Sequence, residues 1–243
     1  MFILTTPQEY LMFGFGKTPP PENLLPKLRG FDKKINQEKN IKEKRKLVSI
    51  ALIDDEPFAA KQSLTNLGYS LTELGDINRI DEIEKFPIVL CDLKGVGKNF
   101  NYKTEGAGLI GEIKANYPNI YVLAYTGNLR GGLASSAREV ADGFLRKDAT
   151  NEQWVLLLDE YVDKTTSVQQ VWLNARRNLC DLGVETHVVL ALEKAYCEDV
   201  LSKDADFSML RKTQSDTAIG ATAKNIVTGI VSNGIFAALA ALI

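Results

Sequence analysis

Four short apolar runs constrain the fold of this chain more than any other feature of its sequence. Each run is continuous, is rich in branched or aromatic residues, and leads into a polar or charged side chain; the runs span 47–53, 88–91, 120–125 and 143–145. Continuous runs of this length are typical of parallel strands that are buried on both faces of a sheet. The sequence therefore predicts a parallel sheet.

Helix and strand signals alternate from residue 47 to residue 163. A helix is predicted over 58–67, where Pro57 stands at its start and Gly68 stops it. Further elements follow: a strand over 69–74, a short helix capped by Asp76 or Asn78 and ending at 86, helices over 106–117 and 133–141, and a last helix with Trp154, Leu157, Leu158 and Tyr161 on its apolar stripe. Five strand–helix units indicate an α/β domain with a doubly wound five-stranded parallel sheet.

The polar residues that follow the apolar runs define a candidate site. They are Asp54 and Asp55, Asp92, Thr126 and Lys147. Ligands of doubly wound sheets gather at the carboxyl ends of the strands, which is where all five residues are expected. Three carboxylates that meet there would repel one another unless a hard cation neutralised them, and Mg²⁺ prefers such oxygen ligands. Asp54, Asp55 and Asp92 are therefore candidate magnesium ligands.

Four stretches carry a resemblance to a known family: Ala-Leu-Ile-Asp-Asp-Glu-Pro at 51–57, Val-Leu-Cys-Asp-Leu at 89–93, Val-Leu-Ala-Tyr-Thr-Gly at 122–127 and Gly-Phe-Leu-Arg-Lys at 143–147. Together and in this order they make residues 47–163, about half of the chain, similar to the receiver domain of two-component response regulators, which has a flavodoxin-like fold. Agreement across several levels of the sequence supports this reading more than any one stretch does.

The resemblance implies a phosphorelay switch with Asp92 as the phosphoacceptor. A histidine kinase or a phosphotransfer protein would supply the phosphoryl group, and the backbone carbonyl of Lys94 would complete the protein ligands of Mg²⁺. Lys147 would place a positive charge on the phosphoryl oxygens, and the Thr126 hydroxyl would donate a hydrogen bond to them. The chain would then be a signalling switch that is not a conventional enzyme, with autodephosphorylation as its only catalytic act.

The family's usual conformational switch has two parts, a hydroxyl that moves toward the phosphoryl group and an aromatic residue that turns inward. Thr126 and Phe144 match these two parts, although filling of the core is an equally weighted role for Phe144.

Two features depart from the family pattern. The loop over 95–106 is longer and more basic than usual, and Asp148 stands where a proline is common.

Several other classes of site are disfavoured. The only histidine, His187, excludes a histidine-based metal cluster and a Ser-His-Asp triad. The run Gly-Val-Gly-Lys at 95–98 lacks the first glycine of a phosphate-binding P-loop, whose position Asp92 occupies. A phosphatase of the haloacid dehalogenase type would need a second acid two residues after Asp92, where this chain has Lys94.

The first 46 residues form a basic arm, with ten Lys and Arg against five Asp and Glu. A solvated linker is the favoured interpretation, and contact with an anionic membrane surface is the alternative. The cysteines, Cys91, Cys180 and Cys197, have no paired spacing, which fits a reducing compartment. The protein is therefore expected in the cytoplasm.

Residues 164–217 are predicted to form a helical output region with helices over 168–182 and 186–201. No helix-turn-helix with a basic recognition helix is present, and the pairs Arg176-Arg177 and Arg211-Lys212 are too few for a DNA-binding surface. Nucleic acid is therefore not an expected partner, and a role as a transcription factor is disfavoured.

Residues 218–243 are predicted to form a hydrophobic C-terminal helix in which Lys224 is the only charged residue. The last 19 residues, 225–243, are just long enough to cross a bilayer as a helix. Three interpretations stay open: association with the inner face of the membrane, packing on residues 164–213, and a homo-oligomer interface.

These inferences together predict a response regulator whose helical C-terminal half acts by protein or membrane contact. The alternative from a different class is a membrane-acting effector or scaffold that uses a receiver-like domain without phosphorylation. The first hypothesis requires phosphoryl uptake, whereas the function of the second would survive Asp92→Asn.

Overall fold

The computed structural model describes residues 24–100, 103–128 and 130–241. Its centre is a five-stranded sheet in the order β2-β1-β3-β4-β5, in which every neighbouring pair of strands is parallel. The strands are β1 (Ser49–Ile53), β2 (Ser70–Glu73), β3 (Ile88–Asp92), β4 (Tyr121–Thr126) and β5 (Gly143–Arg146). This order is that of the flavodoxin-like doubly wound fold. The predicted fold class is confirmed.

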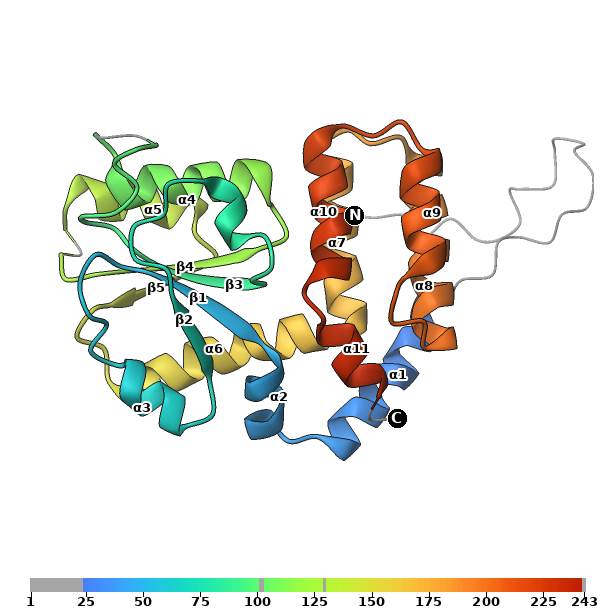
Figure 1. The fold of residues 1–243 in the computed structure, drawn as a ribbon, viewed down its shortest axis with the longest axis horizontal. Coiled ribbons are helices and arrows are strands. Elements are labelled where there is room, and N and C mark those ends of the chain that lie inside the picture. Colours follow the sequence, from blue (N-terminus) through green and yellow to red (C-terminus); the bar gives the residue numbers. More distant parts are fainter. Residues whose placement is uncertain (1–23, 101–102, 129, 242–243) are drawn as a thin grey trace, which may run out of the picture.

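Helices cover both faces of the sheet, which explains why the strands read as continuous apolar runs. On one face lie α3 (Lys61–Asn66) and α6 (Asn151–Thr166), and on the other lie α4 (Glu105–Asn116) and α5 (Gly132–Val140) (Figure 1). Alternate strand residues face opposite sides. Leu52, Leu90 and Leu123 enter the core beneath α3 and α6. Ala51, Val89 and Val122 enter the core beneath α4 and α5.

Two predicted helices are shorter in the structure than in the sequence analysis. The helix predicted over 58–67 begins only at Lys61, because Phe58 precedes a turn at 59–60 and its ring is buried against Trp154. The helix predicted to end at residue 86 is a 3₁₀ turn, η2 (Ile80–Ile83). The Glu82 carboxylate accepts hydrogen bonds from the backbone N–H groups of Asn78 and Arg79, which caps the start of this turn.

The region that the charge pattern assigned to a solvated linker instead contains two packed helices, α1 (Leu25–Glu38) and α2 (Ile41–Leu47). Two of its basic residues are buried in ion pairs with α6. Arg45 makes paired 2.7 Å hydrogen bonds to both Asp159 oxygens, and Lys44 lies 2.7 Å from Asp163. α1 buries Leu28, Phe31 and Ile35. The linker prediction is therefore corrected for residues 25–46, and the rest of the arm lies outside the described residues.

The C-terminal half is helical, as predicted, and shares a core with the sheet. It contains α7 (Val168–Asp181), α8 (Thr186–Ser202), α9 (Ser208–Asp216), α10 (Ala221–Ser232) and α11 (Ile235–Ala240). The core beneath α3 and α6 continues without interruption into this half. α6 itself runs past the predicted domain boundary at residue 163 and reaches the helical half (Figure 1). A division into domains at 163/164 therefore stays a prediction.

The hydrophobic C-terminal segment packs into the protein as two helices. The stretch Ala221–Ala240 is long and apolar enough to cross a membrane by length and composition. It is broken after Asn233, where Gly234 has a φ of 68°, a left-handed conformation that favours glycine. The break lets both helices turn apolar residues inward: Ala223, Ile226, Val227, Ile230, Ile235, Phe236 and Leu239. The predicted apolar C-terminal helix is confirmed, with a break at Gly234 that divides it into α10 and α11.

Candidate functional site

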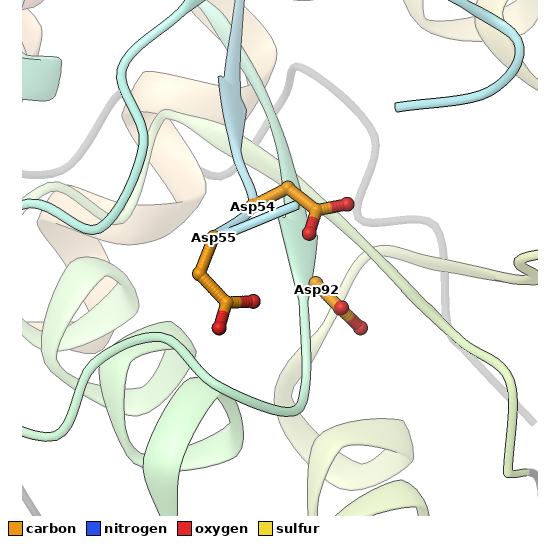
Figure 2. A group of neighbouring side chains, drawn as sticks. All are labelled: Asp54, Asp55 and Asp92. Carbon is orange, nitrogen blue, oxygen red and sulfur yellow. The ribbon is translucent and has the colours of Figure 1, made fainter. Parts of the chain in front are cut away.

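Three carboxylates meet at the carboxyl ends of neighbouring strands. Asp54 and Asp55 follow β1, Asp92 ends β3, and the register pairs Ile53 with Cys91, so the two strand ends are level. One oxygen from each carboxylate lies within 4.8 Å of the others. Figure 2 shows the three side chains as one group. Asp54 and Asp92 are buried, whereas Asp55 is exposed.

Lys147 brings a positive charge to this group. Its ammonium lies 2.9 Å from Asp92 Oδ2, 3.2 Å from Asp54 Oδ2 and 3.5 Å from Glu56 Oε2. Partial burial acts to lower the pKa of Lys147, but the hydrogen bonds and charges of Asp92 and Asp54 outweigh burial and raise it. The lysine therefore stays charged. Glu56 is an addition to the residues predicted from sequence.

The Asp92 carboxylate is held by a backbone N–H group as well as by Lys147. Its Oδ1 accepts the N–H of Leu93 at 2.7 Å, while Oδ2 faces the lysine. Burial raises the pKa of the Asp92 carboxyl, and the contact with Lys147 opposes this shift. Positive charge at the site thus favours the anionic form of Asp92.

The remaining predicted residues lie on β4, on β5 and directly after β3. Thr126 ends β4, is buried, and its hydroxyl oxygen accepts the N–H of Asn128 at 3.2 Å. Phe144 on β5 is half-buried with the Arg138 guanidinium 4.6 Å above its ring. Lys94 is exposed in the turn directly after β3. The roles of Thr126 and Phe144 in switching, and of the Lys94 carbonyl as a metal ligand, stay predictions.

The long loop after β3 folds back on the site. The N–H of Gly95 donates to Glu105 Oε2, and that of Gly97 donates to Asp76 Oδ1, both at 2.7 Å. Gly95 has a φ of 90°, and a Cβ atom there would lie 2.2 Å from an oxygen of Asp55. The loop backbone therefore passes directly against a candidate metal ligand.

The start of α4 touches the backbone of the phosphoacceptor candidate, which leads to a mutational prediction. A Cβ atom on Gly106 would lie 2.1 Å from the carbonyl oxygen of Asp92 and 2.8 Å from Leu93 Cα. Gly106→Ala is expected to lower the free energy of unfolding by about 1–3 kcal/mol through overpacking. It is also expected to displace Asp92 and weaken Mg²⁺ binding. Urea denaturation and a Mg²⁺ titration measure the two effects.

A second glycine of the same helix provides the control. Gly111 has no atom within 4 Å of an added Cβ. Gly111→Ala is therefore expected to raise the free energy of unfolding by up to about 1 kcal/mol, because alanine has the better helix propensity. Equal effects at both positions would show that the contact between α4 and Asp92 does not constrain the site.

Sequence reasoning missed Tyr125 as a residue of the site. It is fully buried on β4, and its hydroxyl donates a 2.7 Å hydrogen bond to Asp54 Oδ2. A buried tyrosine hydroxyl usually has a hydrogen-bond partner. A tyrosine inside an otherwise apolar strand, one residue before Thr126, was the signal that could have found it.

No protein-family model matches this chain, and no curated protein matches it in sequence. Several solved structures are similar. The chemotaxis protein CheY4 of Vibrio cholerae has 17% identity, with 47% of this chain and 98% of that chain covered and a TM-score of 0.39. Full-length FixJ of B. japonicum has 17% identity, 81% and 98% coverage and a TM-score of 0.42. RcsB of Salmonella enterica serovar Typhimurium, bound to promoter rprA, has 16% identity, 68% and 98% coverage and a TM-score of 0.37. The fold assignment rests on the strand order itself.

Proposed function

We propose that this chain is a response regulator that accepts a phosphoryl group on Asp92 from a histidine kinase or a phosphotransfer protein. One observation carries the proposal: the two carboxylates that follow β1 and the ammonium of Lys147 surround Asp92 at the rim of a flavodoxin-like sheet. Ligands of such sheets bind at this rim. The residue types are those that phosphoryl transfer to a carboxylate requires.

The donor set fits Mg²⁺. Asp54, Asp55 and Asp92 offer only carboxylate oxygens, and Mg²⁺ prefers oxygen ligands while keeping several waters. The backbone carbonyl of Lys94 is the further protein ligand that we propose. Bound Mg²⁺ supplies positive charge that offsets the repulsion among the carboxylates and the charge of the phosphoryl oxygens.

The transfer step uses groups that are already in place. An oxygen of Asp92 forms the new bond to phosphorus while the P–N bond to the donor histidine breaks, and the imidazole leaves with the electron pair and takes up a proton. Lys147, which lies 2.9 Å from Asp92 Oδ2, stabilises the negative charge on the transferred group. The Thr126 hydroxyl moves toward the phosphoryl group and donates a hydrogen bond to one of its oxygens. The ring of Phe144 turns inward in response.

Within the described residues, the helical half contacts the sheet domain away from the candidate site, which would leave room for a donor protein. Its direct contacts with the sheet domain include those of Asn174 and Asn178 with Asn119, which precedes β4, and of Asn225 with Asn116 at the end of α4. These contacts lie at the amino ends of the strands, opposite the candidate site. We propose that the helical half gives the output by contact with another protein or with another copy of this chain.

Nucleic acid is not part of the proposed output. Arg176 forms an ion pair with Glu193, and the Arg211 side chain donates to the carbonyl of Asp206. These arginines therefore have partners within the chain. We place the protein in the cytoplasm, where it would meet a kinase.

A second candidate function has one observation in its favour. The Ala221–Ala240 stretch has the length and composition to cross a membrane. A membrane-acting effector or scaffold could use the sheet domain for protein contact and release this segment to the inner face of the membrane. Insertion would first require the buried side chains of α10 and α11 to leave the core.

Uptake of a phosphoryl group from a small donor tests the proposed function. Purified protein incubated with Mg²⁺ and acetyl phosphate is expected to gain the mass of one phosphoryl group, because the site itself supplies most of the catalysis. Removing Mg²⁺ with EDTA is expected to prevent the gain. Intact-mass spectrometry measures both. A protein that gains no mass with Mg²⁺ present would contradict the proposal and favour the scaffold function.

A further inference from the structure

A single buried hydroxyl connects the acidic group to the core beneath it. Tyr125 has no solvent exposure, and its ring lies on the α3 and α6 face of the sheet. The hydroxyl reaches up to Asp54 Oδ2 at 2.7 Å. Burial, followed by the hydrogen bond and charge of Asp54, raises the pKa of Tyr125 far above its usual value. A tyrosine hydroxyl carries its proton at neutral pH, so Tyr125 donates this hydrogen bond to Asp54 from inside the core.

The other contacts of Asp54 leave its carboxylate with little freedom. Its Oδ1 accepts the backbone N–H of Glu56 at 3.0 Å, and the Lys147 ammonium lies 3.3 Å from the same atom. Tyr125 holds the second oxygen. Among these contacts the one with Tyr125 comes from inside the core, where the donor cannot move into solvent. The hydrogen bond from Tyr125 thus fixes the plane of the Asp54 carboxylate from the core side.

We propose that Tyr125 is a positioning residue of the metal site, holding the Asp54 carboxylate in the orientation in which it binds Mg²⁺. The inference rests on the proposed function, since it assumes that Asp54, Asp55 and Asp92 bind the ion. Hydrogen bonds from the protein to metal-ligating carboxylates orient the ligand, and losing one weakens metal binding. Without the hydroxyl, the orientation of the Asp54 carboxylate would have to be fixed when the ion binds, and this would lower the affinity for Mg²⁺.

The same residue links the site to α6. The Tyr125 ring packs on Phe58 at 5.3 Å and on Trp154 at 5.7 Å between centroids, and Phe58 and Trp154 pack edge to face at 5.1 Å. Trp154 lies in the first turn of α6, the helix that continues toward the C-terminal half. A change in the orientation of the Asp54 carboxylate is therefore transmitted to Trp154 on α6 through the side chain of Tyr125.

Calorimetric Mg²⁺ titrations of the full chain test the inference. Tyr125→Phe removes the hydroxyl and keeps the ring, and its Mg²⁺ affinity is expected to fall by about 10- to 100-fold. Tyr121→Phe is the matched control, because Tyr121 lies on the same strand but packs on Tyr161. Its affinity is expected to equal that of the unchanged protein. Thermal unfolding of both variants verifies that they fold.

A second readout uses tryptophan fluorescence. Mg²⁺ is expected to change the emission of Trp154 in the unchanged protein and in Tyr121→Phe, and to change it much less in Tyr125→Phe at the same ion concentration. Trp172 lies in the helical half, stacked on Tyr196, and contributes a constant background.

The outcomes separate this inference from the function on which it rests. Equal Mg²⁺ affinity in the unchanged protein and Tyr125→Phe would overturn the inference and leave the proposed function intact. An equal loss in both tyrosine variants would assign the effect to a loosened β4 and would also overturn it. Failure of the unchanged protein to bind Mg²⁺ would overturn the metal site itself, and the inference with it.

Discussion

Asp92→Asn is expected to abolish phosphoryl uptake from acetyl phosphate. An amide oxygen is not a nucleophile toward phosphorus, and no other described carboxylate combines the burial of Asp92 with a 2.9 Å contact to Lys147 and a place at the centre of the acidic group. The variant should fold, because asparagine has nearly the same shape and the burial of a charged carboxylate is unfavourable. Intact-mass spectrometry in the presence of Mg²⁺ measures the loss.

Asp148→Asn is the matched control for this prediction. Asp148 directly follows Lys147 and is exposed, and its carboxylate pairs with Arg146. Its removal changes the net charge near the site by the same amount, so uptake should persist. Uptake by Asp92→Asn would show that another residue is the phosphoacceptor. An Asp92→Asn protein that keeps its biological activity would favour the scaffold function.

Phe236→Ala is expected to lower the free energy of unfolding by about 3–5 kcal/mol, the usual cost of removing a buried phenylalanine. Phe236 is only 6% exposed, and its ring packs on Phe207 at 4.8 Å and on Phe31 at 5.7 Å between centroids. The substitution therefore opens a cavity where α11, α1 and the start of α9 meet. Chemical denaturation, followed by circular dichroism, measures the change.

Leu156→Ala serves as the control, because Leu156 on α6 is 77% exposed and its loss should change stability by less than about 0.5 kcal/mol. If Phe236→Ala were equally neutral, the C-terminal segment would not be packed in solution. Sedimentation with anionic vesicles would then be expected to carry the protein down, and the membrane-acting function would gain support. A large loss of stability instead identifies the segment as part of the core.

The sheet and the position of its polar residues were predictable because both depend on short-range patterns. The apolar runs before Asp54, Asp92 and Lys147 correspond to β1, β3 and β5, since a strand buried on both faces allows few polar residues. The parallel order then places the ends of these strands along one edge. Residues far apart in sequence were therefore correctly expected at one rim.

Predictions from local patterns failed where a residue has a partner far away in the sequence. Lys44 and Arg45 were predicted to be solvated, but in the structure they pair with Asp163 and Asp159, more than a hundred positions away. The helix over 58–67 began late because Phe58 is used in the aromatic cluster with Trp154. In both cases a contact across the fold outweighed a weak local preference.

The five strands, the acidic rim and the helical nature of the second half were predictable from the residues alone, because hydrophobic period and strand-end chemistry are local. The packing of α1, α10 and α11 on the core beneath α3 and α6, and the hydrogen bond from Tyr125 to Asp54, became evident only in the folded chain. An apolar helix has the same sequence whether it meets lipid, another copy or its own chain. The choice depends on which complementary surface is nearby, and that information exists only once the chain has folded.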